Sequence, residues 1–343
     1  MRILVTGGGG FLGAAAIRAM IARGDTAIAF DTRLDSLAPC LSPSPGPHPT
    51  LSRGERDLMS AASPARGEGD GRLIRVVGDI TDMANVAQAV AVHKPDAALH
   101  CAAIVGVLSS LGSPINVVRV NVEGSLNLFE AMRLGGIRRC VHMSSEEAYG
   151  AFRADKIDET HPLDPVLPYG ICKAAVEQLG RSYRELHGLE VINLRTSWVY
   201  GPGLPRDRIP KNLVDAALAG RRLHIPTGAE SAIDHTHVDD VVSAILAALD
   251  HRQHRYDAYN IASGRVATVA QIVAIVRDLV PGAQLSVGPG AYRHGDRIDM
   301  VRKGALDVSR AASELGWTPR HDIRSGLAAY VKAAREAQAA AKC

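Results

Sequence analysis

Short apolar runs alternate with longer segments of helical periodicity along the first half of the chain. The apolar runs, which we expect to be strands, are Arg2–Thr6, Thr26–Phe30, Leu73–Val77, Ala97–Cys101, Arg139–Met143 and Val191–Leu194. The helical segments are Phe11–Arg23, Asp82–His93, Ile115–Leu134 and Tyr169–His187. Because strands that are apolar throughout are typical of a sheet covered on both faces, the pattern predicts an α/β fold with a doubly wound parallel sheet.

Two segments interrupt this alternation. Residues 39–71 are rich in Pro, Gly, Ser and charge, which predicts a mobile surface insertion, with a functional lid as the alternative. After Tyr200 the sequence GPGLPRDRIP leads away from the sheet. The predicted division is a Rossmann-type domain over 1–196 whose sheet also receives about 234–262, and a smaller C-terminal substrate-binding lobe over 197–233 and 263–343.

Charge and cysteine content narrow the class of protein. The 39 basic and 36 acidic residues leave a formal net charge of +3, which gives no reason to expect nucleic acid or a membrane as a partner. The five cysteines are scattered without CxxC spacing, which favours a reducing compartment. A strand that begins at residue 2 leaves no room for a signal peptide, and no apolar run is long enough to span a bilayer. The expected location is the cytoplasm.

A glycine cluster lies between the first strand and the first helix. Residues 6–13 read TGGGGFLG, which places Gly7, Gly10 and Gly13 where a backbone turn can approach a pyrophosphate at a helix N-terminus. Asp31 ends the second strand, where a carboxylate accepts hydrogen bonds from an adenosine ribose and repels the extra phosphate of NADP. The sequence therefore predicts NAD as the cofactor, while Arg33 is the residue that could favour NADP instead.

A tyrosine and a lysine lie four residues apart in the predicted helix 169–187. In the sequence YGICK, Tyr169 and Lys173 share one helical face, so the ammonium can favour the phenolate. A tyrosine tuned in this way can remove a hydroxyl proton while hydride leaves the carbon. The preceding strand ends in Ser144–Ser145, where a hydroxyl can hydrogen-bond the same substrate oxygen. This order indicates an oxidoreductase site.

Several motifs in this order resemble those of the extended short-chain dehydrogenase/reductase family, and within it the NAD-dependent sugar epimerases and dehydratases. The motifs are TGGGGFLG, GDI at 78–80, HCAA at 100–103, NVEGSLNLFEA at 121–131, SSEEAYG at 144–150, YGICK, RHGD at 293–296 and LGWTP at 315–319. The resemblance implies cofactor contacts from Gly7, Gly10, Phe11, Leu12, Gly13, Asp31, Asp79, Ile80, Ala102, Ala103, Asn121, Tyr169 and Lys173. It also implies Ser145 as the catalytic hydroxyl, with Ser144 as the adjacent alternative, and a homodimer formed through two helices that flank the active-site strand.

Two acidic residues follow Ser145. Glu146 and Glu147 occupy positions where related dehydratases carry an Asp–Glu pair and related decarboxylases a Ser–Glu pair. Once a hydroxyl has been oxidised to a ketone, the neighbouring C–H is acidic, and a carboxylate can remove that proton. We therefore count Glu147 as a candidate catalytic base and Glu146 as a substrate contact. The alternative is that both acids bond the backbone or line a polar pocket.

Two positions depart from the pattern of the sugar-nucleotide enzymes. Ile233 takes the place of an arginine, and Trp198 that of an asparagine, both of which commonly hold the diphosphate in the family. Arg293 remains in RHGD as a candidate contact for a phosphate or carboxylate, and Trp198 as a candidate contact for the substrate. The RTSWVYG sequence around Trp198 resembles reductases of dTDP-4-keto sugars. A free sugar or sugar acid is therefore an alternative to a nucleotide-linked substrate.

His235 and His237 are the only residues that suggest a metal site. In a strand they would face opposite sides, and the sequence offers no evident third ligand, so we expect no metal. The function predicted overall is that of an NAD-dependent epimerase/dehydratase-type enzyme that oxidises a sugar hydroxyl to a ketone as its first step. The alternatives are an NAD-dependent dehydrogenase of a free sugar or sugar acid, and a non-catalytic NAD-binding regulator. The combination of Ser145, Tyr169 and Lys173 argues against the regulator.

Overall fold

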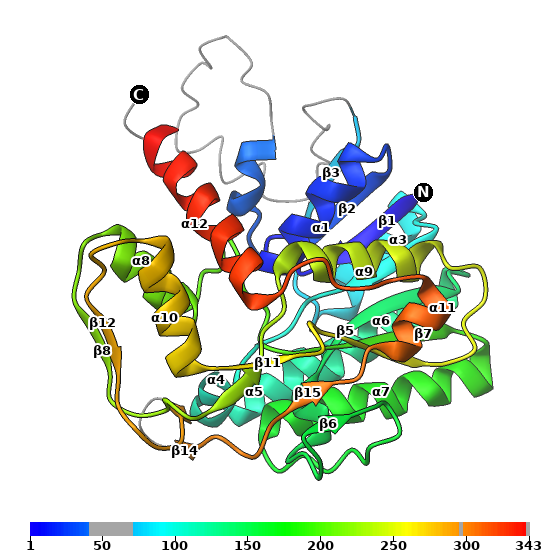
Figure 1. Ribbon diagram of the computed structural model, residues 1–343. Coiled ribbons are helices and arrows are strands. Elements are labelled where there is room, and N and C mark those ends of the chain that lie inside the picture. The colour runs from blue at the N-terminus through cyan, green and yellow to red at the C-terminus, as the bar shows by residue number, and fades with distance from the viewer. Residues whose placement is uncertain (41–70, 295–297, 341–343) are drawn as a thin grey trace.

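The computed structural model describes residues 1–40, 71–294 and 298–340 of the chain. The insertion predicted over 39–71 lies outside the described residues except at its two ends. Within the described part, a central sheet carries helices on both faces, and a smaller lobe built from the C-terminal half lies beside it (Figure 1).

The central sheet has seven strands, and every neighbouring pair in it is parallel. The strands are β1 (Arg2–Thr6), β2 (Thr26–Asp31), β3 (Leu73–Val77), β4 (Ala97–His100), β5 (Arg139–Ser145), β7 (Glu190–Thr196) and β10 (Ala258–Ile261). Their order is β10-β7-β5-β4-β1-β2-β3, so the direction of winding reverses between β1 and β4. The predicted doubly wound fold is confirmed, and ligands of such sheets bind at this reversal point.

Successive residues of the strands face two separate cores, as the period of two in a strand requires. Ile3 and Val5 of β1 pack with α1 (Phe11–Ala22), α9 (Val238–Asp250) and α11 (Ser309–Leu315). Leu4 packs on the other face with three further helices. These are α3 (Met83–His93), α6 (Gly124–Leu134) and α7 (Pro168–His187). Because both faces are covered, the strands are apolar along their whole length, which is the pattern seen in the sequence.

The helix expected over Ile115–Leu134 is divided into three pieces. The pieces are α5 (Pro114–Val118), one π-helical turn η2 (Arg119–Glu123) and α6. Asn121 lies buried in the π turn, where its side chain accepts a hydrogen bond from the N–H of Ile104 (2.8 Å) and donates one to the Ile104 carbonyl (3.0 Å). The wider turn therefore holds the segment between β4 and α4 (Val107–Gly112) against the helix. Such π turns are often found near functional sites.

The C-terminal lobe has its own apolar core. Its helices are α8 (Lys211–Leu218), α10 (Val269–Leu279) and α12 (Ile323–Ala340). Its small sheets pair β8 (Leu223–Ile225) with β12 (Leu285–Val287), β9 (Ala232–Asp234) with β11 (Val266–Thr268), and β13 (Arg293–His294) with β14 (Ile298–Asp299). A further pair, β15 (Ala305–Leu306) with β6 (Lys156–Ile157), joins the end of the chain to the segment after β5. Two further short elements of the described residues are η1 (Asp35–Cys40) and η3 (Glu146–Tyr149).

The strand expected to hold His235 and His237 is shorter than predicted. Strand β9 ends at Asp234, and His237 is the N-cap of α9, where its Nδ1 accepts the N–H of Asp239 (3.3 Å). Both histidines are buried. The prediction that they alternate along a strand is therefore wrong, because the chain turns into a helix one residue after His237.

Candidate active site

A cavity of about 520 Å³ opens at the carboxyl ends of the sheet strands. Of the residues predicted to bind the cofactor, those that line it are Gly7, Gly10, Phe11, Leu12, Gly13, Asp31, Asp79, Ile80, Ala102, Ala103, Tyr169 and Lys173. The predicted substrate and catalytic residues that line it are Ser144, Ser145, Glu146, Glu147 and Trp198. Asn121 and Arg293 are not among the lining residues, so the structure brings all but two of the predicted positions to one cavity.

The glycine loop is packed so closely that side chains do not fit at three of its positions, Gly7, Gly9 and Gly13. Gly7 has a φ of +70°, and a Cβ placed on it would lie 2.6 Å from the backbone nitrogen of Ala102. A Cβ on Gly13 would lie 2.1 Å from the carbonyl oxygen of Gly7. The loop then leads into α1, whose N-cap is Gly10. Backbone N–H groups at such a helix start suit a pyrophosphate, so the loop fits the predicted dinucleotide.

Asp31 lies at the end of β2 beside this loop. One carboxylate oxygen, Oδ2, accepts the backbone N–H of Gly9 (3.0 Å), and Oδ1 accepts the N–H of Arg33 (3.3 Å). Asp79 and Ile80, which follow β3, line the same end of the cavity. The position suits a contact with the adenosine part of a dinucleotide. The role of Asp31 toward the ribose stays a prediction.

Tyr169 and Lys173 extend from the first turns of α7 into the cavity. Burial raises the pKa of Tyr169 to about 12, while a hydrogen bond with Ser145 and the nearby charges of Arg206 and Arg208 oppose that shift. Burial lowers the pKa of Lys173 to about 8. The ammonium of Lys173 donates to the carbonyl of Met143 (2.6 Å) and lies 5.9 Å from the centre of the tyrosine ring. Burial therefore disfavours the charged form of both residues, the phenolate of Tyr169 and the ammonium of Lys173. An additional positive charge beside the phenol would favour its ionisation.

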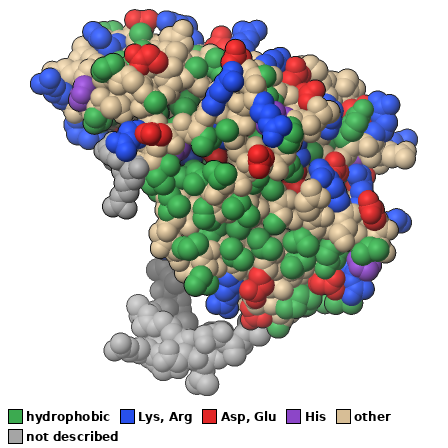
Figure 2. Space-filling model, turned by 90° about the horizontal axis from the view of Figure 1, so that it is seen from below, with side chains coloured by type: hydrophobic (Ala, Val, Ile, Leu, Met, Phe, Trp, Pro, Cys, Tyr) green, Lys and Arg blue, Asp and Glu red, His purple; other side chains and the backbone are tan. Residues whose placement is uncertain are grey.

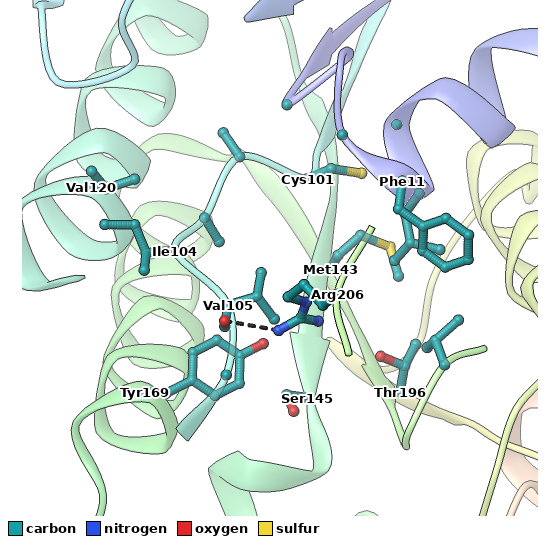
Figure 3. Close-up of a pocket in the computed structure, with 18 of the residues that line it drawn as sticks. Phe11, Cys101, Ile104, Val105, Val120, Met143, Ser145, Tyr169, Thr196 and Arg206 are labelled. Carbon is teal, nitrogen blue, oxygen red and sulfur yellow. Dashed lines mark hydrogen bonds between the residues drawn. The ribbon is translucent and has the colours of Figure 1, made fainter. Parts of the chain in front are cut away.

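The two adjacent serines have different partners. The hydroxyl of Ser144 donates to Glu177 (2.5 Å), which forms a fully buried ion pair with Arg195 (2.5 Å). The hydroxyl of Ser145 accepts the N–H of Glu147 (3.2 Å) and lies close enough to Tyr169 to lower the pKa of its phenol. Figure 3 shows Tyr169 and Ser145 directed into the same space. The geometry thus favours Ser145 over Ser144 for the catalytic hydroxyl, and this assignment remains a proposal.

The two glutamates also differ in their surroundings. Glu146 is 2% exposed, its Oε1 has no hydrogen-bond partner among the described residues, and burial raises its pKa to about 7. The Oε2 of Glu147 lies 3.3 Å from the ammonium of Lys303, which precedes β15. Sequence reasoning missed Lys303, because nothing in the sequence shows that a residue more than 150 positions away packs against SSEEAYG.

Two arginines of the segment after β7 line the cavity, and sequence reasoning missed them as well. Arg206 donates to the Val105 carbonyl (2.8 Å), and Figure 3 shows its guanidinium close to the tyrosine hydroxyl. Arg208 places its guanidinium carbon 4.7 Å from the centre of the Trp198 ring. Within the described ranges neither arginine has a carboxylate partner. The sequence signal was PRDRIP, two arginines soon after the carboxyl end of a strand.

The two positions that depart from the sugar-nucleotide pattern are both apolar and buried. Ile233 belongs to the core of the C-terminal lobe. Trp198 has a φ of +31°, an uncommon value for a bulky residue, and its ring packs against His294 and Tyr292. Arg293 forms an ion pair with Asp299 (2.9 Å) on the surface, at 43% side-chain exposure. The expectation that Arg293 lines the substrate site is therefore not met here, because its charge is directed to a neighbouring strand.

A polar cluster near the start of α9 corrects one further expectation. His237, Asp239 and His321 place one potential ligand atom each within 4.8 Å of one another, so the third ligand that the sequence did not offer comes from the end of the chain. Nδ1 of His237 accepts the helix-cap N–H of Asp239, while its Nε2 is buried without a hydrogen-bond partner among the described residues. Nδ1 of His321 lies 3.1 Å from Asp240, so the cluster lies at the junction between α9 and the C-terminal segment. In the described part of the chain, no helix is long and apolar enough to cross a membrane.

Comparison with known proteins gives a consistent result. Residues 3–262 match the model of the family described as "NAD dependent epimerase/dehydratase family". The chain is 29% identical over 336 residues to a UDP-glucose 4-epimerase of Mycolicibacterium smegmatis, covering 97% of this chain and 98% of the relative. The solved UDP-glucose 4-epimerase of Thermotoga maritima with UDP-glucose superposes with a TM-score of 0.81 at 27% identity, over 98% of this chain and all of the other. A dTDP-glucose 4,6-dehydratase of Streptomyces venezuelae with NAD bound gives 0.78 at 27% identity, over 99% and 98%.

Proposed function

The chain belongs to the NAD dependent epimerase/dehydratase family, and from this premise we propose that its substrate is an anionic sugar derivative whose charge is held by Arg206 and Arg208. The chain is an NAD-dependent enzyme of the sugar epimerase and dehydratase type, and its first chemical step oxidises a sugar hydroxyl to a ketone. The observation that carries the proposal is that two arginines without a carboxylate partner, within the described ranges, share one cavity with Tyr169 and Ser145.

In this proposal Tyr169 is the general base. Ser145 donates its hydrogen bond to the reacting oxygen and Tyr169 removes the hydroxyl proton, since both side chains meet in the cavity. Lys173 favours the ionised phenol through its charge and contacts the nicotinamide ribose. Bound NAD supplies the hydride acceptor and a positive ring beside the phenol. The burial that raises the pKa of Tyr169 in the unliganded site is therefore opposed when the cofactor is present.

The step after oxidation is assigned to Glu147. The ketone makes the neighbouring C–H acidic, and Glu147 lies in the cavity with a cation at one of its oxygens. Proton removal there leads to dehydration or to epimerisation next to the ketone. If the wild-type enzyme incorporates deuterium from D₂O at that carbon and Glu147→Gln does not, while NADH formation persists in both, the assignment holds. Free NADH without deuterium would indicate the alternative, a dehydrogenase of a free sugar or sugar acid.

The anion held by the two arginines has two possible sources, a diphosphate or a sugar carboxylate. The probes are UDP-glucose, UDP-glucuronate and free glucuronate, titrated calorimetrically into the enzyme with NAD. Replacing Arg206 or Arg208 by glutamine is expected to weaken the binding of the anion by about 1.5–3 kcal/mol. This is the usual contribution of a hydrogen bond to a charged group. Arg221→Ala, at an exposed position outside the cavity, is the control.

The pattern across the probes identifies the source. A diphosphate anchor makes both UDP compounds sensitive to the arginine substitutions, whereas a carboxylate anchor makes the two glucuronates sensitive and leaves UDP-glucose unchanged. Unchanged affinity of all three probes in both variants would contradict the proposed role of the arginines.

We also propose a homodimer formed through the face that carries α4, α5 and α7. Ile115 of α5 is 81% exposed, and Val118, Ile171, Leu108 and Leu111 are exposed as well. Figure 2 views the molecule from the side where Figure 1 shows these helices, and hydrophobic side chains gather across that face. A large exposed apolar surface is typical of a protein interface. Light scattering after gel filtration is expected to give twice the chain mass for the wild type and a single chain mass for Ile115→Glu.

A further inference from the structure

We propose that Lys303 is a positioning residue that gives the two glutamates different roles. Its ammonium holds Glu147 as the ionised base, and the proton of the pair stays on Glu146. The proposal rests on the proposed function of Glu147. It assigns a role in the active site to a residue of the C-terminal segment that does not itself line the cavity. Lys303 acts through Glu147, so it is distinct from the residues that touch substrate or cofactor.

The geometry of Lys303 is that of a buried cation with one carboxylate partner. Its side chain is 1% exposed, and its ammonium lies 3.3 Å from Oε2 of Glu147 and 3.3 Å from the carbonyl oxygen of Gly150. The ammonium also lies 5.2 Å from the centre of the Phe152 ring. A buried charge is costly unless it is paired, so these contacts fix the position of the ammonium and, through it, of Oε2. The other oxygen of Glu147 is left for the substrate.

The neighbouring glutamate has no such partner. Glu146 is the N-terminal residue of η3 and is enclosed, with one oxygen unbonded within the described ranges. Burial and the charges of Glu147 and Asp234 oppose ionisation of Glu146, whereas the charge of Lys303 favours it. Two adjacent carboxylates that share one cation do not both ionise readily. The proton therefore remains on the carboxyl that lacks the direct ion pair.

This division has a chemical consequence for the step after oxidation. The C–H bond next to the ketone breaks, its proton passes to the free oxygen of Glu147, and its electron pair enters the enolate of the substrate. The pair of glutamates then holds two protons, and the one on Glu146 is available to a leaving hydroxyl or to the carbon. Without Lys303 no cation among the described residues would hold Oε2 of Glu147, and the difference between the two carboxyl groups would be lost.

Other charged groups face the same carboxylates and must be considered in any pH measurement. The charge of Glu147 affects the pKa of Tyr169 in α7 and of His294 in β13, and the charge of Arg208 affects both. Lys303 itself lowers the pKa of His294. Because the ammonium of Lys303 is in direct contact with Oε2, its substitution is expected to act first on the two glutamates, and the glutamate label separates their bands from the titration of His294.

The experiment follows carboxyl protonation directly, by infrared difference spectroscopy of the full-length enzyme with ¹³C-labelled glutamate during a pH titration. In the wild type we expect one carboxyl to titrate near neutral pH, and its band to be lost in Glu146→Gln. In Lys303→Met the midpoint is expected to move to higher pH by about one unit, because the cation that favoured ionisation is gone. Lys303→Arg restores the wild-type midpoint, which a merely structural role would not predict.

The second readout is the exchange of the substrate C–H proton with D₂O. Lys303→Met is expected to slow this exchange at least about tenfold while NADH formation persists, because general base catalysis needs the ionised carboxylate. Lys156→Met, which removes an exposed lysine from the adjoining strand β6, is the matched control. Lys303→Gln, which keeps the length of the side chain and its polar end, provides a second charge-free variant if the methionine variant does not fold.

The outcomes separate this inference from the proposed function. If the wild type exchanges no deuterium but the Lys303 variants shift the carboxyl midpoint, Glu147 is not the C–H base, and the assignment of Lys303 to the pair stands. If a folded charge-free variant titrates and exchanges as the wild type does, the role of Lys303 is overturned and that of Glu147 remains.

Discussion

The two halves of the cavity are built in different ways. The half proposed to receive the dinucleotide is built mainly on backbone, namely the glycine loop, the residues after β4 and the N-terminus of α1, with the Asp31 carboxylate beside it. The half proposed to receive the substrate is made of side chains from different segments: Arg206 and Arg208 from the one after β7, and Glu147 from the one after β5. A surface made of backbone imposes its requirements on residues that are adjacent in sequence, whereas converging side chains are set by tertiary packing.

Lys173 is the residue at which the two halves meet. Its helix, α7, packs against the sheet and carries Tyr169, the proposed general base, one turn earlier. Its ammonium donates to the carbonyl of Met143, two residues before the end of β5 at Ser145. The comparison predicts that substitutions in the substrate half alter turnover and those in the loop alter cofactor affinity.

The largest expected effect lies in the substrate half. Tyr169→Phe keeps the ring and removes the acid–base group, so turnover should fall by about 10²–10⁴-fold while NAD affinity barely changes. Steady-state kinetics and calorimetric titration of NAD measure the two quantities. Tyr183→Phe is the matched control on the same helix, because the hydroxyl of Tyr183 bonds Glu130, which is not a cavity-lining residue. Near-full turnover of Tyr169→Phe would contradict the catalytic assignment.

A second substitution tests the backbone half. Gly13→Ala puts a methyl group 2.1 Å from the carbonyl oxygen of Gly7, so the loop must shift. We expect a loss of about 1–3 kcal/mol in NAD binding, the usual cost of overpacking. Gly112→Ala, where the added methyl meets no atom within 4 Å, should leave NAD affinity unchanged. Equal NAD affinity of Gly13→Ala and wild type would show that the loop can shift to accept the methyl group without any loss of NAD binding.

The same contrast explains how much of the molecule could be predicted from its sequence. The strands, the glycine loop and the YxxxK helix have local signals, because strand burial and helix periodicity depend on neighbouring residues. Lys303 has no local signal, since its role depends on where the C-terminal segment folds back. Arg206 has one in PRDRIP, but that sequence does not show that the loop after β7 brings the guanidinium to the tyrosine. The division of the helix 115–134 was missed because a π turn leaves its residues helical in pattern. Arg293 was assigned to the site by resemblance, yet here it pairs with Asp299.

The smallest expected effect concerns the choice between two forms of the cofactor. Because the Asp31 carboxylate would repel a 2′-phosphate, NAD is expected to bind at least about tenfold more tightly than NADP, or about 1.4 kcal/mol. Asp31→Asn keeps an oxygen that can accept the N–H of Gly9, a bond of 3.0 Å in the wild type, but removes the charge. It should therefore improve NADP binding and leave NAD binding nearly unchanged, as measured by calorimetry. Arg33→Ala separates the alternative: if NADP affinity falls in that variant while wild type binds both forms equally, Arg33 rather than Asp31 decides the preference. The result would show that even the backbone half relies on one side chain for its selectivity.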